Sequence, residues 1–217
     1  MMRVDLTGAA AREHDRPVGT RVNQKARTRA AIVQAVHELA SSGAEITMPS
    51  IAKAALVSEA TAYRYFPDLV TLLLEADQGT WPDPDEALAP VADTADPVER
   101  IGYAARLLLD GVLANESAVR AMIAGSISRP AVAARRPGHR FGLIDAALAP
   151  AADRLDPAGL AQLRRDLAVV VSADALFTLT DLCGLSRPDA VRSAVHTARA
   201  LTAAAFRPLV NHLPADD

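Results

Sequence analysis

The segment Thr47–Phe66, TMPSIAKAALVSEATAYRYF, decides the fold of this 217-residue chain. Its pattern predicts a helix over 48–55, a turn at the next two residues, and a second helix that runs to the end of the segment. Thr47 and Ser58 precede these helices, and a hydroxyl at such a position accepts a hydrogen bond from the free N–H groups of the first turn. The sequence therefore predicts two short, capped helices joined by a tight turn.

The apolar residues of this segment fit two helices that cross closely. Ile51, Ala55 and Val57 face one way. Ala62 and Phe66, spaced i and i+4, face them from the second helix. The residues left on the outside of the second helix are mostly polar or aromatic, which suits the edge of a DNA major groove. These outward residues are Glu59, Ala60, Thr61, Tyr63 and Arg64.

The residues between about 25 and 74 resemble the DNA-binding domain of the TetR family of bacterial regulators. The residues that carry the resemblance are Thr28-Arg29-Ala30-Ala31-Ile32, Thr47, Ile51-Ala52, Ala55, Val57-Ser58 and Thr61-Ala62-Tyr63-Arg64-Tyr65-Phe66. The resemblance implies an all-α protein with a three-helix, helix-turn-helix DNA-binding lobe at the N-terminus. It also implies a C-terminal helical lobe that binds a small molecule and dimerises through its last two long helices.

Two residues depart from the pattern of that family. The family usually has Gly in the turn, where this chain has Leu56. Either a left-handed backbone at this residue costs roughly 1 kcal/mol, or the turn differs slightly. The family also often has Lys after the second helix, against phosphate. This chain has Pro67-Asp68 there and lacks that cation.

We expect the second helix to read bases and its surroundings to hold phosphates. The expected base readers are Glu59, Ala60, Thr61 and Tyr63. Ala60 can meet a thymine methyl group, and Glu59 can accept a hydrogen bond from cytosine. The residues expected at phosphates are Thr28, Arg29, Thr47, Ser58, Arg64 and Tyr65, with guanine as an alternative target of Arg64.

Composition limits the class of protein. Half of the residues are hydrophobic but only 4% are aromatic, so the core must be mostly Ala, Leu and Val, which favours helices over sheet. The net charge is −3, yet no acid lies between the basic residues Arg16 and Arg29, and phosphate contacts need only a one-sided charge. A single cysteine, Cys183, excludes an internal disulfide, and we expect it to be a buried thiol. We find neither a signal peptide nor a membrane-length apolar run, so we expect a cytoplasmic protein without a membrane partner.

Three segments are expected along the chain. Residues 1–22 show no period and are expected to be a flexible basic arm, which either reaches a minor groove or stays free. Residues 23–79 are expected to form the DNA-binding domain, with a first helix over 23–42 and a fourth helix opened by Pro67. Residues 80–217 are expected to form the effector-binding and dimerisation domain. Its helices are expected at about 85–92, 97–114, 117–128, 138–154, 157–182 and 188–210.

The helix expected over 157–182 carries the best clue to a ligand site. One face of this helix is apolar near its start and carries two carboxylates near its end. The carboxylates of Asp174 and Asp181 would form the polar end of a pocket, pair with Arg192 or Arg199 at an interface, or face solvent. This face carries the stripe Leu167, Val171, Asp174, Thr178 and Asp181.

The remaining candidates are large side chains and one basic loop. Arg135 and Arg136 would bind an acidic ligand or be solvated. The five histidines show no metal-ligand spacing, and no phosphate-loop or nucleophile motif occurs, so we expect no metal, no cofactor and no catalytic residue. The side chains that could line a pocket or simply fill the core are Trp81, Tyr103, Met122, Phe141 and Phe177.

Together these features predict a homodimeric transcription regulator, most simply a repressor. It would bind a palindromic double-stranded DNA operator and be released by a small-molecule effector. Two other functions stay open: an architectural DNA-binding protein without an effector, and a helical enzyme that its first lobe targets to DNA.

Overall fold

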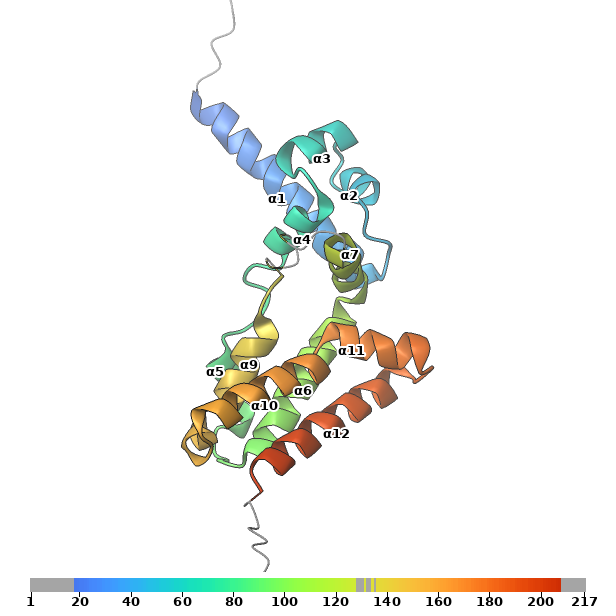
Figure 1. Ribbon diagram of the computed structural model, residues 1–217. Coiled ribbons are helices and arrows are strands. Elements are labelled where there is room, and N and C mark those ends of the chain that lie inside the picture. Colours follow the sequence, from blue (N-terminus) through green and yellow to red (C-terminus); the bar gives the residue numbers. More distant parts are fainter. Residues whose placement is uncertain (1–17, 128–130, 132–133, 135, 208–217) are drawn as a thin grey trace, which may run out of the picture.

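The computed structural model describes residues 18–127, 131, 134 and 136–207, and all regular secondary structure in these residues is helical. The expectation of an all-α fold is therefore confirmed for them. The helices gather into two groups, one above the other in Figure 1, each around its own hydrophobic core. Within the described ranges, no helix is both long enough and apolar enough to span a membrane.

Four helices of the upper group come first in the chain. They are α1 (Val18–Ser42), α2 (Met48–Ala54), α3 (Glu59–Tyr65) and α4 (Leu69–Ala76). Because α1 begins at Val18, residues 18–22 of the expected arm are helical, and residues 1–17 of that arm lie outside the described residues. Pro67 does not open α4, because Asp68 is its N-cap and accepts a 2.8 Å hydrogen bond from the backbone N–H of Thr71.

The upper group also holds α7 (Glu116–Ile127), which comes later in the chain. Ala118, Ala121 and Met122 of α7 pack against the same core as α1 to α4. The approach to α4 is close: a Cβ atom on Gly125 would lie 2.5 Å from Val70 Cγ2. Glycine is required there because any side chain would push the two helices apart.

The lower group is built around α6 (Pro97–Ala114), which packs against α9 (His139–Leu148) and α12 (Arg187–Ala205). In Figure 1, α6 and α12 run side by side. The α6 helix keeps the expected bounds, and its N-cap Asp96 accepts from the backbone N–H of Val98 at 2.9 Å. The other elements are α5 (Pro84–Ala87), the 3₁₀ turns η1 (Ala89–Val91) and η2 (Ala149–Arg154), α10 (Pro157–Val170), α11 (Ala173–Phe177) and the π-helical turn η3 (Thr178–Leu182).

The single helix expected over 157–182 is wrong. The chain leaves the helical conformation at Val171, with φ −90° and ψ 67°, so α10 ends there. Ser172 then caps a new helix, accepting a 3.1 Å hydrogen bond from the backbone N–H of Ala175. The stripe that was to join Leu167 to Asp181 on one face does not exist, because its members lie on three different elements.

Several other helices end at residues that differ from those expected, and each difference has a physical reason. The helices expected over 85–92 and 138–154 each break into an α-helix and a 3₁₀ turn that contains a proline, Pro90 or Pro150, which cannot donate to the helix ladder. The last helix ends at Ala205, and residues 208–217 lie outside the described residues. Cys183 is exposed rather than buried, because it sits in the turn after η3 beside Gly184, whose φ is +68°.

A buried arginine joins several elements of the lower group. Arg100 is 7% exposed and donates to the backbone carbonyls of Val91, Ala146 and Ala147 at 2.7–3.1 Å and to that of Thr94 at 3.5 Å. These bonds tie α6 to η1 and to the C-terminal end of α9. The buried cation is stable there because its donors are satisfied.

Candidate nucleic-acid interface

The start of α2 is fixed by a reciprocal pair of hydrogen bonds. Thr47 Oγ1 accepts from the backbone N–H of Ser50, and Ser50 Oγ accepts from the backbone N–H of Thr47 at 2.9 Å. Two backbone donors at the helix end are thereby satisfied at once. Thr47 is the cap expected from the sequence.

The turn between α2 and α3 contains a strained residue. Leu56 has φ +56° and is the non-glycine residue with positive φ among those described. The turn is closed by the N–H of Val57, which donates to the carbonyl of Ala52 at 3.0 Å, as in the common helix ending with a left-handed residue. The Leu56 side chain is 93% exposed, so packing does not compensate for this conformation.

The α3 helix is capped by Ser58 and buried on one side. Ser58 Oγ accepts a 3.2 Å hydrogen bond from the backbone N–H of Thr61 and bonds to its hydroxyl at 2.9 Å. Ala62 and Phe66 are fully buried, and Ile51 of α2 meets them in the same core. The packing expected of the two helices is therefore observed, with α3 held by its cap and its inner face.

The outer face of α3 is open. The Tyr63 side chain is 48% exposed, and Arg64 lies at the same surface with its guanidinium carbon 5.8 Å from the ring centroid of Tyr65. Of the residues expected at DNA, the exposed ones are Ser58, Glu59, Ala60, Tyr63 and Arg64, and the half-buried ones are Thr28, Arg29, Thr47, Thr61 and Tyr65. The structure thus brings four residues of the α3 outer face together, with Ser58 at its start.

Arg29 is placed otherwise than expected. Its guanidinium forms a two-pronged ion pair with Glu75 of α4, donates to the carbonyl of Tyr65 at 3.3 Å, and lies 4.3 Å from the ring centroid of Phe66. The Glu75 hydrogen bond is the main reason that the pKa of Arg29 is raised. Arg29 therefore joins α1, α3 and α4 within the protein. Thr28 is likewise engaged locally, donating to the carbonyl of Gln24 at 3.0 Å.

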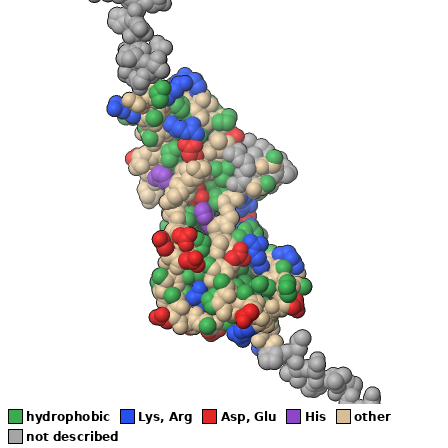
Figure 2. Space-filling model, turned by 90° about the vertical axis from the view of Figure 1, so that its left-hand side faces the viewer, with side chains coloured by type: hydrophobic (Ala, Val, Ile, Leu, Met, Phe, Trp, Pro, Cys, Tyr) green, Lys and Arg blue, Asp and Glu red, His purple; other side chains and the backbone are tan. Residues whose placement is uncertain are grey.

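Charge is unevenly distributed over the molecule. In Figure 2, Lys and Arg side chains gather at the end that carries the N-terminal helices, whereas the lower lobe carries Asp and Glu side chains interspersed with Lys and Arg. The exposed basic residues of α1, α2 and α3 include Lys25, Arg27, Lys53 and Arg64. A near-neutral lobe with a cationic end can contact phosphates at that end.

The residues expected at a ligand fall into two places. Trp81, Met122 and Phe141 line one cavity in the region where α6, α7 and the start of α9 meet. Asp174, Phe177 and Asp181 line a shallow groove along α7, on the outside of the molecule. Tyr103 packs against the core of the lower lobe, so the structure supports its interpretation as core.

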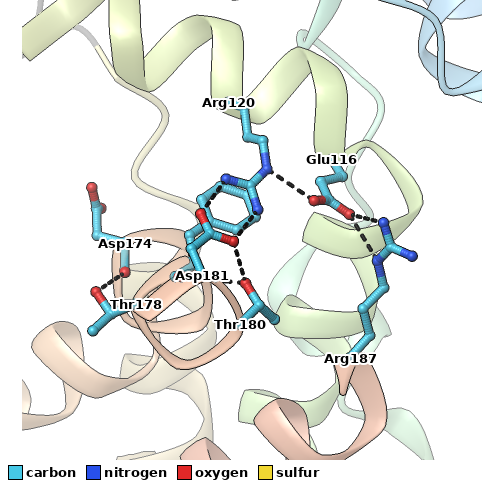
Figure 3. Close-up of polar contacts among 8 residues, drawn as sticks. Glu116, Arg120, Asp174, Thr178, Thr180, Asp181 and Arg187 are labelled. Carbon is cyan, nitrogen blue, oxygen red and sulfur yellow. Dashed lines mark hydrogen bonds and ion pairs between the residues drawn. The ribbon is translucent and has the colours of Figure 1, made fainter. Parts of the chain in front are cut away.

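Arg120 of α7 organises the second place, as Figure 3 shows. It donates to both carboxylate oxygens of Asp181 at 2.7 and 2.8 Å and to Glu116 at 2.8 Å. Its guanidinium carbon lies 3.8 Å from the ring centroid of Phe177. Glu116 also accepts from Arg187 at 2.9 Å, so α7 is tied to η3 and to the start of α12.

These contacts show which partners the two aspartates have within one chain. Arg120, followed by Thr180, lowers the pKa of Asp181 from its ordinary value of 3.8 to about 2. Asp174 accepts a 3.0 Å hydrogen bond from Arg136. Within the described chain, neither carboxylate pairs with the arginines of α12 that were considered as partners. Each is an exposed carboxylate with an arginine partner of its own.

Sequence reasoning missed the pair that joins the two lobes. His139 Nε2 donates to Asp77 Oδ2 at 2.6 Å, and the His139 ring stacks on Trp81 with centroids 5.0 Å apart. The pair was missed because 62 residues separate its members, so no spacing pattern could reveal it. Among the residues described here, no group of three or more His, Cys, Asp or Glu side chains could hold a metal ion.

A scan against protein-family models returned no match, and a search of curated proteins returned none either.

Proposed function

We propose that this protein is a homodimeric, sequence-specific DNA-binding regulator of the TetR type, most simply a repressor, whose α3 helix enters the major groove. The observation that carries the proposal is the outer face of α3. It presents Glu59, Ala60, Tyr63 and Arg64 to solvent from a helix whose opposite face is fully buried. A short exposed helix, held rigidly by caps and packing, is what base readout in the groove needs.

The proposed contacts follow from the exposure of each residue. Glu59, Ala60 and Tyr63 would reach base edges, and Arg64 would reach a phosphate or a guanine. Thr47 and Ser58 are caps with their hydroxyls at the same surface, so they would fix the register at phosphates. Arg29 is left out of this set because its donors are occupied by Glu75 and Tyr65.

Release by a small molecule is supported by the junction between the lobes. The α4 helix contacts α7 through Val70 and Gly125, and its C-cap Asp77 pairs with His139 of α9. Both α7 and α9 line the cavity that also contains Trp81 and Phe141. A ligand that favours one arrangement of α7 and α9 would thus favour one position of α4, and the change in operator affinity would equal its difference in affinity for the two states.

The same cavity favours this proposal over an architectural DNA-binding protein without an effector. It is partly open to solvent, has a volume of about 280 Å³, and is lined by apolar side chains with a few polar groups, as small-molecule sites usually are.

Dimerisation would use the surface formed by α10 and α12, which pack against each other. Val169 of α10 is 70% exposed, and α12 carries the small residues Ala200 and Ala204 in exposed positions. Two subunits related by a two-fold axis would then place their α3 helices on a palindromic operator.

The experiment that tests the proposal is the selection of bound duplexes from a random-sequence pool with the purified protein at near-physiological salt. The expected result is enrichment of a palindrome whose half-sites lie on one face of the duplex. Absence of enrichment for a folded, dimeric protein would contradict the proposal. The Tyr63→Ala variant serves as the matched negative sample.

A further inference from the structure

The cavity at the junction of the lobes has walls that are mostly apolar. It lies between α6, α7 and the start of α9, with Trp81 at its edge. Its apolar lining consists of Leu108, Val112, Val119, Met122, Ile123 and Phe141. Such a cavity with a few polar groups at one end is typical of a small-molecule site.

The polar end of the cavity is basic. Arg136, His139 and Arg140 line it together with Asp77, which is paired with His139. The ten-residue helix α9 also begins there, and its N-cap Gly138 provides no side-chain acceptor for the free N–H groups of the first turn. Free N–H groups at a helix N-terminus attract an anion.

Arg140 is the unsatisfied group at this end. Its Nε atom is buried and has no hydrogen-bond partner among the described residues, but the side chain as a whole is only partly buried and lines the cavity, so an anion there would be met by its terminal nitrogens. By contrast, the buried guanidinium of Arg100 donates to several carbonyls. Burial, and then the positive charge of Arg136, lower the pKa of Arg140, against a smaller opposite effect of Asp174. An arginine nevertheless stays protonated in a protein, so Arg140 carries a positive charge at this end of the cavity without a hydrogen-bonded anion.

The nearby carboxylates do not supply that anion. Asp77 accepts from His139 at 2.6 Å, and Asp174 accepts from Arg136 at 3.0 Å while its own side chain is 51% exposed. Neither of them hydrogen-bonds Arg140 in the described structure. A bound anion would supply Arg140 with the partner that these two carboxylates do not provide.

We propose that this cavity binds an amphipathic organic anion, with its acid group at Arg140 and the start of α9 and its apolar body between α6 and α7. The volume of about 280 Å³ lies near the lower end of the range of roughly 300–1,000 Å³ for ligand pockets, which suits a small ligand. Only the statement that this ligand is the effector rests on the proposed function. Binding itself does not depend on DNA.

The test compares three probes of one length and different charge on the DNA-free protein: octanoate, octanol and octylammonium. Their affinities are measured by calorimetry and by the fluorescence of Trp81, the single tryptophan of the chain, which lines the cavity. Octanoate is expected to bind at least roughly tenfold more tightly than octanol, because only the anion pairs with the buried cation, and octylammonium is expected to bind most weakly. Equal binding of octanoate and octanol, or no binding of octanoate up to millimolar concentration, would overturn the proposal.

Two variants separate the site from the fold. Arg140→Gln is expected to weaken octanoate binding by roughly tenfold or more and to leave octanol binding unchanged. The control Arg106→Gln removes an exposed arginine of α6 and should change neither affinity. If Arg140→Gln weakens both probes alike, Arg140 only supports the fold and the proposal is overturned.

Failure of this inference and failure of the proposed function are distinguishable. If octanoate binding depends on Arg140 but the protein enriches no duplex, the anion site is supported and the proposed regulatory function is contradicted. An enriched palindrome together with no preference for the anion would do the reverse.

Discussion

His139 Nε2 and Asp77 Oδ2, 2.6 Å apart, form a hydrogen bond that joins α9 of the lower lobe to the end of α4 in the upper lobe. Both side chains are largely buried, with 32% and 22% of their surface exposed. Replacing Asp77 with Ala is expected to lower the free energy of unfolding by about 1 kcal/mol, since a partly buried donor loses its partner. Urea unfolding measures this loss. Asp93→Ala, at an exposed loop position, is the control and should change it little.

The same substitution has an optical consequence. Trp81 stacks on the His139 ring, so release of the ring should shift the emission of this single tryptophan in Asp77→Ala. Unchanged emission together with unchanged stability would mean that the pair does not hold the lobes.

Leu56→Gly is expected to stabilise the protein. The residue adopts φ +56°, a conformation that costs an L-residue about 1–2 kcal/mol and costs glycine almost nothing, against about 0.5–1 kcal/mol for the added freedom of glycine when unfolded. The side chain is 93% exposed, so its loss removes little packing. The net gain of about 0.5–1 kcal/mol is measured by urea unfolding. Leu56→Ala keeps the strain and should show no gain, so equal stability of the two variants would contradict the argument.

The Arg120–Asp181 pair predicts a pH dependence of stability. The pKa of Asp181 is lowered to about 2 in the folded protein, so the carboxylate stabilises the fold at pH values above its ordinary pKa of 3.8. This contribution is lost as the pH falls through the window from 3.8 to about 2. Asp181→Asn should therefore show a smaller loss of stability on acidification in that window, measured by unfolding at several pH values. Asp153→Asn, an exposed aspartate of η2, should keep the dependence of the unmodified protein.

Tyr63→Ala tests the outer face of α3. The side chain is 48% exposed, so its truncation should leave the melting temperature and the dimer unchanged. Under the proposed function it should weaken operator affinity roughly tenfold, which is about 1.4 kcal/mol. Fluorescence anisotropy with a labelled operator measures this. Unchanged affinity would mean that α3 does not read the DNA.

Val169→Glu tests the proposed dimer surface. An exposed valine on α10 loses nothing in the monomer when it becomes charged, but a glutamate buried between two subunits would carry an unpaired charge. Light scattering is expected to show a monomer with an unchanged helical spectrum. Ala89→Glu, at an exposed position of η1, is the control. A Val169→Glu protein that remains dimeric would place the interface elsewhere.

The elements that the sequence revealed well are those governed by local chemistry. Thr47 and Ser58 cap helices as expected, and the bounds of α6 agree with those expected. Caps, prolines and apolar spacing act within a few residues, so their effects can be predicted from the sequence alone. The left-handed turn at Leu56 is one of the two outcomes expected at the position where the family that the sequence resembles has glycine.

The features that escaped prediction depend on contacts between distant residues. The break at Ser172 was hidden because the apolar spacing continues through it, although a serine before a short acidic turn is a weak cap signal. The role of Arg29 depends on Glu75, and the basic end of the cavity depends on His139 and Arg140 meeting α6 and α7. Long-range ion pairs leave no periodic trace in a sequence.

The position of α7 has a consequence for exchanging lobes between proteins. This helix follows α6 in the chain but covers the core of α1 to α4, with Gly125 pressed against Val70. A chimera that grafts residues 23–79 alone onto a foreign effector lobe would leave the α4 surface bare and its core incomplete. The transferable unit consists of two pieces of chain, the N-terminal helices and α7, so the chain cannot be recombined at a single crossover near residue 80.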